Sequence, residues 1–140
     1  MIAVLDASVA LKWFLEEPEA AQALTLREHH LRGDLLLVAP DLLLYEVGNA
    51  LRFKHGFTPS DIQRTLSDLL HIQLELVGPT ERLLHHAVDL AHRSKLTYYD
   101  SLYLAVASDL GTRLITADKR LHDASAKLVD VQLLHEVDSS

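Results

Sequence analysis

Short, continuous apolar runs punctuate this chain, and they constrain its fold more than any other feature. Residues 2–5 and 35–38 are wholly apolar, and residues 113–116 have an apolar centre. A strand that is apolar on both faces is buried on both faces, which is typical of parallel sheets covered by helices. Because helix-like segments separate these runs, the order of elements is that of an α/β protein. We therefore expect a three-layer α/β/α sandwich around a mainly parallel sheet of four to five strands.

The segments between the runs carry start and stop signals for helices. Pro18, Asp41, Thr58 and Thr80 stand where helices would begin, and glycine residues follow several of the expected ends. We expect helices over residues 8–14, 19–32, 41–55, 58–70, 80 to beyond 91, 100–110 and 119–126, and two further strands over residues 72–77 and 128–133. The 140 residues fit a single domain, residues 1–140, with fraying expected over residues 137–140.

The composition narrows the classes of function. The chain has no cysteine, which excludes disulfides, thiolate metal sites and cysteine nucleophiles. Its amino terminus lacks the pattern of a secretory signal, and no apolar run approaches the roughly 20 residues that span a bilayer. We therefore expect a cytoplasmic protein with no membrane partner. The formal net charge of −7 argues against electrostatics alone holding a polyanion, so a nucleic-acid substrate would need cations.

Four carboxylates stand at the ends of expected elements. Asp6 follows the first apolar run and Asp118 follows the fourth expected strand, while Glu46 and Asp100 lie in apolar helical segments. In open α/β sheets, ligands bind at the carboxyl ends of the strands. Oxygen ligands of this kind suit hard cations such as Mg²⁺. The pattern predicts a divalent-metal site, although each acid alone also fits a helix cap, a turn or a solvated helix edge.

The segments around these acids resemble those of PIN domains of the VapC toxin type, and the resemblance covers essentially the whole chain. The matching segments are residues 4–14, 40–51, 98–105 and 114–121. The resemblance implies an endoribonuclease that depends on one or two Mg²⁺ or Mn²⁺ ions, with Asp6, Glu46, Asp100 and Asp118 as the catalytic, metal-binding acids. It also implies supporting roles for the polar residues Ser8, Asn49 and Thr116. Water activated by the metal would hydrolyse RNA phosphodiester bonds, leaving a 5′-phosphate and a 3′-hydroxyl.

Basic residues follow or precede several of these acids, and they can guide RNA phosphates along a rim. The candidates are Lys12, Arg52, Lys95, Lys119 and Arg120. Solvated helix ends are the alternative for each of them. Among the aromatic residues, Tyr103 is expected in the core. A zinc site at His85, Asp89 and His92 has little support, because the sequence has no His-Glu-x-x-His motif.

The apolar helices between residues 20 and 70 leave more hydrophobic surface than a small core needs, which indicates a partner. The resemblance implies a small antitoxin protein and a homodimer. Two alternatives remain open: a noncatalytic PIN-fold interaction module, and a Mg²⁺-dependent phosphoaspartyl phosphatase or receiver-type domain. The phosphatase fits poorly, because Ser8 stands where it would need a second aspartate.

Overall fold

The computed structural model describes residues 1–137, which form five strands and seven α-helices. The elements in chain order are β1 (Ile2–Leu5), α1 (Ala7–Ala10), the 3₁₀ helix η1 (Leu11–Trp13), α2 (Ala20–Arg32), β2 (Leu36–Pro40), α3 (Leu42–Arg52), α4 (Pro59–His71), β3 (Glu75–Val77), α5 (Glu81–Ser94), α6 (Tyr98–Leu110), β4 (Leu114–Thr116), α7 (Lys119–Ser125), β5 (Val131–Leu133) and the 3₁₀ helix η2 (Leu134–Glu136). Of the residues 137–140 that are expected to fray, residues 138–140 lie outside the described part of the chain.

The strands form one sheet in the order β3-β2-β1-β4-β5, and every pair is parallel. The register places Val4 beside both Val38 and Leu114. Because the chain runs outward from β1 through β2 to β3 and then returns to β4 on the other side of β1, its winding reverses between β1 and β4. Such a switch point leaves a crevice at the carboxyl ends of the two strands, where ligands of open α/β sheets bind.

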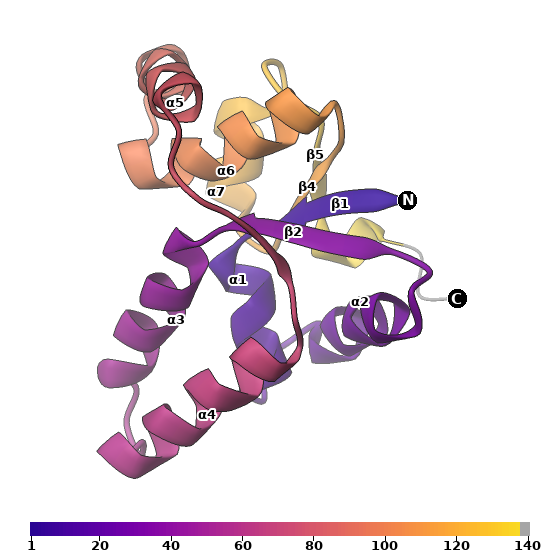
Figure 1. Ribbon diagram of the computed structural model, residues 1–140, viewed down its shortest axis with the longest axis vertical. Helices are drawn as coiled ribbons and strands as arrows, with labels where there is room; N and C mark the ends of the chain where they lie inside the picture. The colour runs from indigo at the N-terminus through magenta and orange to yellow at the C-terminus, as the bar shows by residue number, and fades with distance from the viewer. Residues whose placement is uncertain (138–140) are drawn as a thin grey trace.

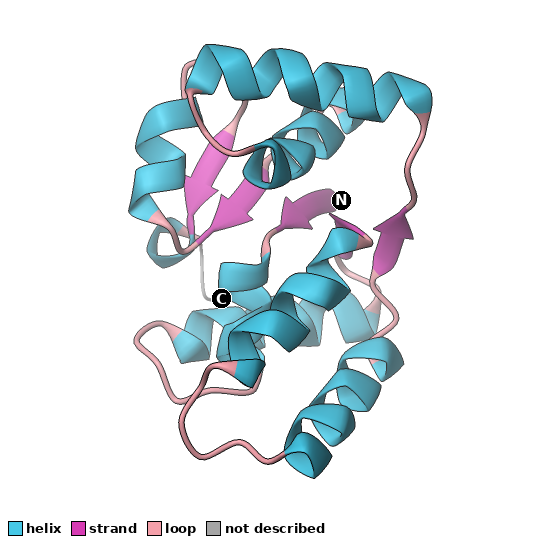
Figure 2. Ribbon diagram, turned by 90° about the vertical axis from the view of Figure 1, so that its left-hand side faces the viewer, coloured by secondary structure: helices cyan, strands magenta, loops and turns pink. Residues whose placement is uncertain are grey.

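Helices cover both faces of this sheet, which confirms the expected α/β sandwich (Figure 1). Helix α6 contacts β1, β2 and β4 on one face, and α5 packs over α6. Residues 101–107 of α6 are buried on every side, because the helix lies between the sheet and α5. On the other face lie α1 and α2, and the pair α3–α4 projects away from the sheet (Figure 2).

The core is a single cluster of apolar side chains that runs through both helical layers. Its centre is the sheet itself, where Ala3, Val4, Leu5, Leu114 and Ile115 are fully buried. Apart from their exposed first residues, Ile2 and Leu36, the apolar strands β1 and β2 are therefore buried on both faces, as their sequences predict. No helix in the described part of the chain is long and apolar enough to cross a membrane.

Several expected elements are shorter in the structure. The third strand begins at Glu75 instead of residue 72, because Ile72 ends α4 and Gln73 has a positive φ of 57°. The last strand begins at Val131, since Leu128 and Val129 still donate backbone hydrogen bonds to Ser125. Helix α3 ends at Arg52, before the expected residue 55, and the expected helix 8–14 is a short α-helix continued by η1.

Candidate active site

Asp6 lies directly after β1 and is the most buried of the four acids, at 5% exposure. Its Oδ1 caps α1 by accepting from the backbone N–H groups of Ser8 at 3.1 Å and Val9 at 3.4 Å. Two hydroxyls also donate to it at 2.5 Å, Ser8 Oγ to Oδ1 and Thr116 Oγ1 to Oδ2. Burial raises the pKa of Asp6 to about 6, although these hydrogen bonds oppose the shift, and the nearby charge of Asp118 adds to it.

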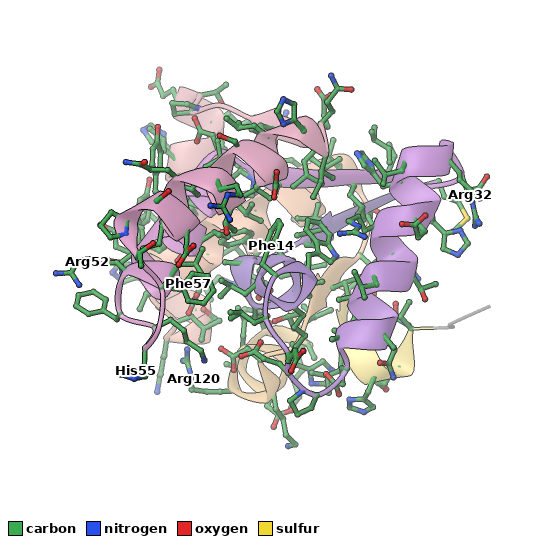
Figure 3. The ribbon with its side chains drawn as sticks, turned by 90° about the horizontal axis from the view of Figure 1, so that it is seen from below. Phe14, Arg32, Arg52, His55, Phe57 and Arg120 are labelled. Atoms are coloured by element: carbon green, nitrogen blue, oxygen red, sulfur yellow. The ribbon has the colours of Figure 1, made fainter. Side chains whose placement is uncertain are left out.

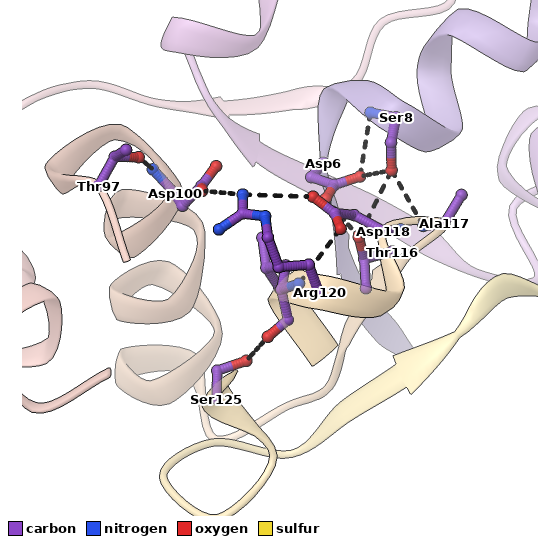
Figure 4. Close-up of polar contacts among 10 residues, drawn as sticks. Asp6, Ser8, Thr97, Asp100, Thr116, Ala117, Asp118, Arg120 and Ser125 are labelled. Atoms are coloured by element: carbon purple, nitrogen blue, oxygen red, sulfur yellow. Dashed lines mark hydrogen bonds and ion pairs between the residues drawn. The ribbon is translucent and has the colours of Figure 1, made fainter. Parts of the chain in front are cut away.

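The same two hydroxyls join the ends of β1 and β4 across the switch point (Figure 4). Ser8 Oγ accepts from the N–H of Ala117 at 2.9 Å, and Thr116 Oγ1 accepts from the N–H of Asp118 at 3.0 Å. Each hydroxyl thus donates to Asp6 and accepts from the segment that carries Asp118. The structure brings Ser8 and Thr116 together with the acids, in positions where they orient Asp6 and fix the start of α7.

Asp100 and Asp118 approach each other from two helices. Asp118 is the N-cap of α7, and its Oδ1 accepts from the N–H of Leu121 at 3.2 Å. Asp100 is the third residue of α6; the cap there is Thr97, whose Oγ1 accepts from the N–H of Asp100 at 3.1 Å. The interpretation of Asp100 as only a helix cap is therefore wrong, because a threonine performs that role and leaves the carboxylate free to face the site.

Arg120 lies between these two carboxylates. Its Nη2 is 3.3 Å from Asp100 Oδ2 and 3.6 Å from Asp118 Oδ2 (Figure 4). The sequence makes Arg120 a candidate for the RNA rim, whereas the structure places its guanidinium inside the acidic cluster. There it supplies the positive charge that two neighbouring carboxylates require.

Glu46 reaches the cluster from α3, on the opposite face of the sheet from α6. Its Oε1 accepts a hydrogen bond of 2.5 Å from the hydroxyl of Tyr103. Partial burial raises the pKa of Glu46; the Tyr103 hydrogen bond opposes the shift, and the charge of Asp100 adds to it. Sequence reasoning assigns Tyr103 to the core and misses this contact. The available signal is its spacing of three residues from Asp100, which puts both side chains on one face of α6.

All four acids thus lie around the switch point, within electrostatic range of their neighbours. Their oxygen atoms are the donors that Mg²⁺ and Mn²⁺ prefer. In the conformation described for residues 1–137, however, no three Asp, Glu or His side chains are close enough to hold one metal ion. Arg120 separates Asp100 from Asp118, and hydroxyls hold Asp6 and Glu46. The chemistry of the donor set nevertheless fits a divalent cation.

The remaining candidates from sequence are placed differently. Asn49 is exposed on α3 and takes no part in the hydrogen bonds just described. Lys12 lies in η1, and its Nζ donates to the carbonyl of Pro18 at 2.8 Å and is 3.6 Å from Glu17. Lys119 pairs with Asp123 at 2.7 Å.

Two rim candidates are exposed to solvent. Lys95 follows α5, and Arg52 lies at the outer end of α3 with its guanidinium 5.4 Å from the centre of the Phe53 ring (Figure 3). Among residues 1–137, neither Lys95 nor Arg52 forms an ion pair with an acid of the site. Both remain predictions as RNA contacts.

Several known proteins are similar to this chain in sequence or in fold. Ribonuclease VapC1 of Mycobacterium tuberculosis is 30% identical over 119 residues, covering 83% of this chain and 86% of that protein. The crystal structure of PAE2754 from Pyrobaculum aerophilum has a TM-score of 0.62 at 26% identity, covering 93% of this chain and 92% of that one. A toxin-antitoxin complex from Klebsiella pneumoniae contains a chain with the same fold, with a TM-score of 0.67 at 21% identity, covering 96% and 99% of the two chains. Residues 3–127 match the PIN domain family, and the chain therefore belongs to this family, among its VapC-type members.

Proposed function

We propose that this protein is a Mg²⁺- or Mn²⁺-dependent endoribonuclease, the toxin of a toxin-antitoxin pair. The observation that carries the proposal is the gathering of Asp6, Glu46, Asp100 and Asp118 at the switch point of the sheet, although they come from four segments that lie far apart in the sequence. The relative from Mycobacterium tuberculosis is named a ribonuclease, which supports RNA as the substrate. Because such a substrate is found in the cytoplasm, the proposal includes a cytoplasmic location.

The four carboxylates would hold the cation, and a bound Mg²⁺ or Mn²⁺ would supply the Lewis acidity for attack of water on a phosphodiester. The protein's own groups organise this chemistry. Ser8 and Thr116 hold Asp6 in one orientation, and Thr97 fixes the first turn of α6 that carries Asp100. Arg120 belongs to the same cluster, and a cation that displaced it from the carboxylates would leave its guanidinium free to pair with an RNA phosphate.

The direct test incubates the purified chain with total cellular RNA, with Mg²⁺ or with EDTA, and maps the cut ends. The proposal predicts Mg²⁺-dependent cuts that leave a 5′-phosphate and a 3′-hydroxyl. Asp100→Asn should lower the rate by about a hundredfold or more, since one anchoring charge is lost. The matched control is Asp123→Asn, which changes an exposed aspartate paired with Lys119 outside the cluster and should leave the rate unchanged. Equal cleavage by the wild type and Asp100→Asn would exclude the proposed site.

An antitoxin partner and a homodimer are part of the same proposal. Large apolar side chains are exposed on α3 and directly after it, with Tyr45 at 71% and Phe53 at 77% exposure. Patches of this kind mark interaction surfaces, and the Klebsiella pneumoniae structure is a toxin-antitoxin complex. Sedimentation of the isolated chain tests the dimer, and a strictly monomeric chain at high concentration would contradict it.

A noncatalytic interaction module is the second candidate, and one observation favours it. Arg120 already forms ion pairs with Asp100 and Asp118, so the cluster has one internal counter-ion without any metal. Titration with Mn²⁺ separates the two functions, because a module that has lost catalysis has no need to bind the ion.

A further inference from the structure

The hydrogen bond between Tyr103 and Glu46 joins two helices that lie on opposite sides of the sheet. Tyr103 lies on α6 and Glu46 on α3, 57 residues apart, and the phenol oxygen is 2.5 Å from Glu46 Oε1. The two helices have their own packing partners, α5 for α6 and α4 for α3. The contact therefore sets where the carboxylate of one layer lies relative to the acids of the other.

The Tyr103 side chain is held firmly enough to act as a fixed donor. It is 1% exposed and stands in the fully buried stretch of α6, so its ring has little freedom to rotate. A buried phenol needs a hydrogen-bond partner, and Glu46 provides it. Burial and the neighbouring carboxylates of Glu46, Asp6 and Asp100 raise the pKa of the phenol far above its ordinary value, so the hydroxyl keeps its proton.

Glu46, by contrast, is only partly buried and lies on a helix whose outer surface is exposed. A glutamate has three side-chain torsions, so it would sample several positions without a fixed partner. The hydroxyl of Tyr103 donates to Oε1 of Glu46. Because the two oxygens belong to one rigid carboxylate, this hydrogen bond also limits the positions of Oε2.

We propose that Tyr103 is a positioning residue of the active site, which holds Glu46 by one oxygen so that the other is available to a divalent cation. The inference rests on the proposed metal-dependent function and adds a residue to it. Partners that orient a ligand in this way commonly change metal affinity by about 10- to 100-fold when they are lost. Tyr103 acts through Glu46, and the experiment must show that dependence.

A double-mutant cycle on Mn²⁺ affinity provides the test, measured by calorimetry on the full chain without RNA. Tyr103→Phe keeps the ring and its packing and removes only the hydroxyl, so it should weaken Mn²⁺ binding about tenfold. Glu46→Gln should weaken binding at least as much. The double variant should bind no more weakly than Glu46→Gln alone, because the hydroxyl has no further role once the carboxylate is gone.

Two further variants separate positioning from a general structural effect. Tyr45→Phe removes the same hydroxyl from the residue next to Glu46, on a side chain that faces solvent, and should leave Mn²⁺ affinity unchanged. Glu46→Asp keeps the charge but withdraws the carboxylate from the hydroxyl without altering the core, and should weaken binding as Tyr103→Phe does. Near-ultraviolet circular dichroism of each variant checks that the aromatic core is intact.

The outcomes distinguish this inference from the proposed function. If the wild type binds Mn²⁺ and Tyr103→Phe binds it equally well, the positioning role is wrong while the metal site stands. If Tyr103→Phe weakens binding as much in the Glu46→Gln background as in the wild type, Tyr103 acts through the general structure, and the inference is again wrong. If neither the wild type nor any variant binds Mn²⁺, both the metal-dependent function and the inference fail.

Discussion

At the scale of single residues, the site brings together negative charges whose mutual repulsion and burial a bound cation would offset. Asp6 is a carboxylate in a buried position, with a pKa raised to about 6 by that burial. Asp100 and Asp118 share one guanidinium from Arg120. Buried carboxylates with fewer positive charges than negative ones are typical of functional sites. A bound cation there favours the ionised forms of the carboxylates.

The raised pKa of Asp6 makes the stability of the metal-free protein depend on pH. Between its ordinary pKa of 3.8 and about 6, the folded protein binds a proton that the unfolded chain does not, so this contribution to stability is lost as the pH rises. From pH 4.5 to 7.5 the loss amounts to about 2 kcal/mol. Asp6→Asn has no such proton to lose. The unfolding free energies of the wild type and Asp6→Asn are compared by urea unfolding in the presence of EDTA. As the pH rises from 4.5 to 7.5, the wild type should lose about 2 kcal/mol of stability relative to Asp6→Asn. A difference between the two proteins that stays constant with pH would contradict the burial of the Asp6 carboxylate.

Arg120 should compete with a cation for Asp100 and Asp118. Arg120→Gln removes two ion pairs of an exposed side chain, pairs that are each worth about 0.2–1 kcal/mol, so Mn²⁺ should bind about fivefold more tightly. Lys119→Gln is the control, because it removes the same charge from the neighbouring residue, whose partner is Asp123. Calorimetry that shows the same gain in both variants would indicate an effect of net charge alone.

At the scale of elements, helix starts place the acids. Asp6 and Asp118 are themselves N-caps, which holds each carboxylate beside backbone N–H groups at the end of a strand. Asp100 depends instead on Thr97, the N-cap of α6, since the threonine hydroxyl accepts from the N–H of Asp100 itself. The cap of α6 is therefore part of the site.

Thr97→Ala and Thr80→Ala test this role as a matched pair. Both threonines cap a helix by accepting from the N–H three residues later at 3.1 Å, Thr97 in α6 and Thr80 in α5. Each alanine variant should lower the unfolding free energy by about 1 kcal/mol. Only Thr97→Ala should also weaken Mn²⁺ binding and slow RNA cleavage, because the first turn of α5 carries no acid of the cluster. Equal loss of Mn²⁺ affinity in both would point to a general effect of stability.

At the scale of the whole molecule, the site lies where every layer meets. β1 and β4 bring Asp6 and Asp118 from the centre of the sheet, while α3 and α6 bring Glu46 and Asp100 from its opposite faces. A ligand shared by these elements binds only the folded chain. It should therefore stabilise the entire fold by mass action.

Mn²⁺ at a hundred times its dissociation constant should add about 2.7 kcal/mol to the unfolding free energy. For a chain of 140 residues this corresponds to a rise of roughly 8–12 °C in the melting temperature. Removal of the ion with EDTA should reverse the rise, and Asp100→Asn should abolish most of it. If Mn²⁺ does not change the melting temperature of the wild type, the noncatalytic interaction module is favoured.

Local patterns in the sequence determined the class of fold and the set of acids. Runs such as residues 2–5 are apolar on both faces, and that alone requires a sheet covered on both sides. The positions of Asp6 and Asp118 after their strands place both at one edge, because parallel strands end at the same side of a sheet. The ends of elements are predicted less well, as for the helix at residues 53–55 and the strand at residues 72–74, since single turns depend on neighbours that a local pattern does not contain.

Tertiary structure alone decided how the side chains of the site are used. The contact of Tyr103 with Glu46 spans 57 residues, and the position of Arg120 between Asp100 and Asp118 depends on how α6 and α7 face each other. Lys12 donates to the carbonyl of Pro18, six residues later in the chain. Such contacts follow from side-chain torsions and from the meeting of distant elements, and neither is encoded in the spacing of residues along one helix or strand. The sequence named the acids by itself, and the packing of two helical layers around the sheet determined which partner holds each one.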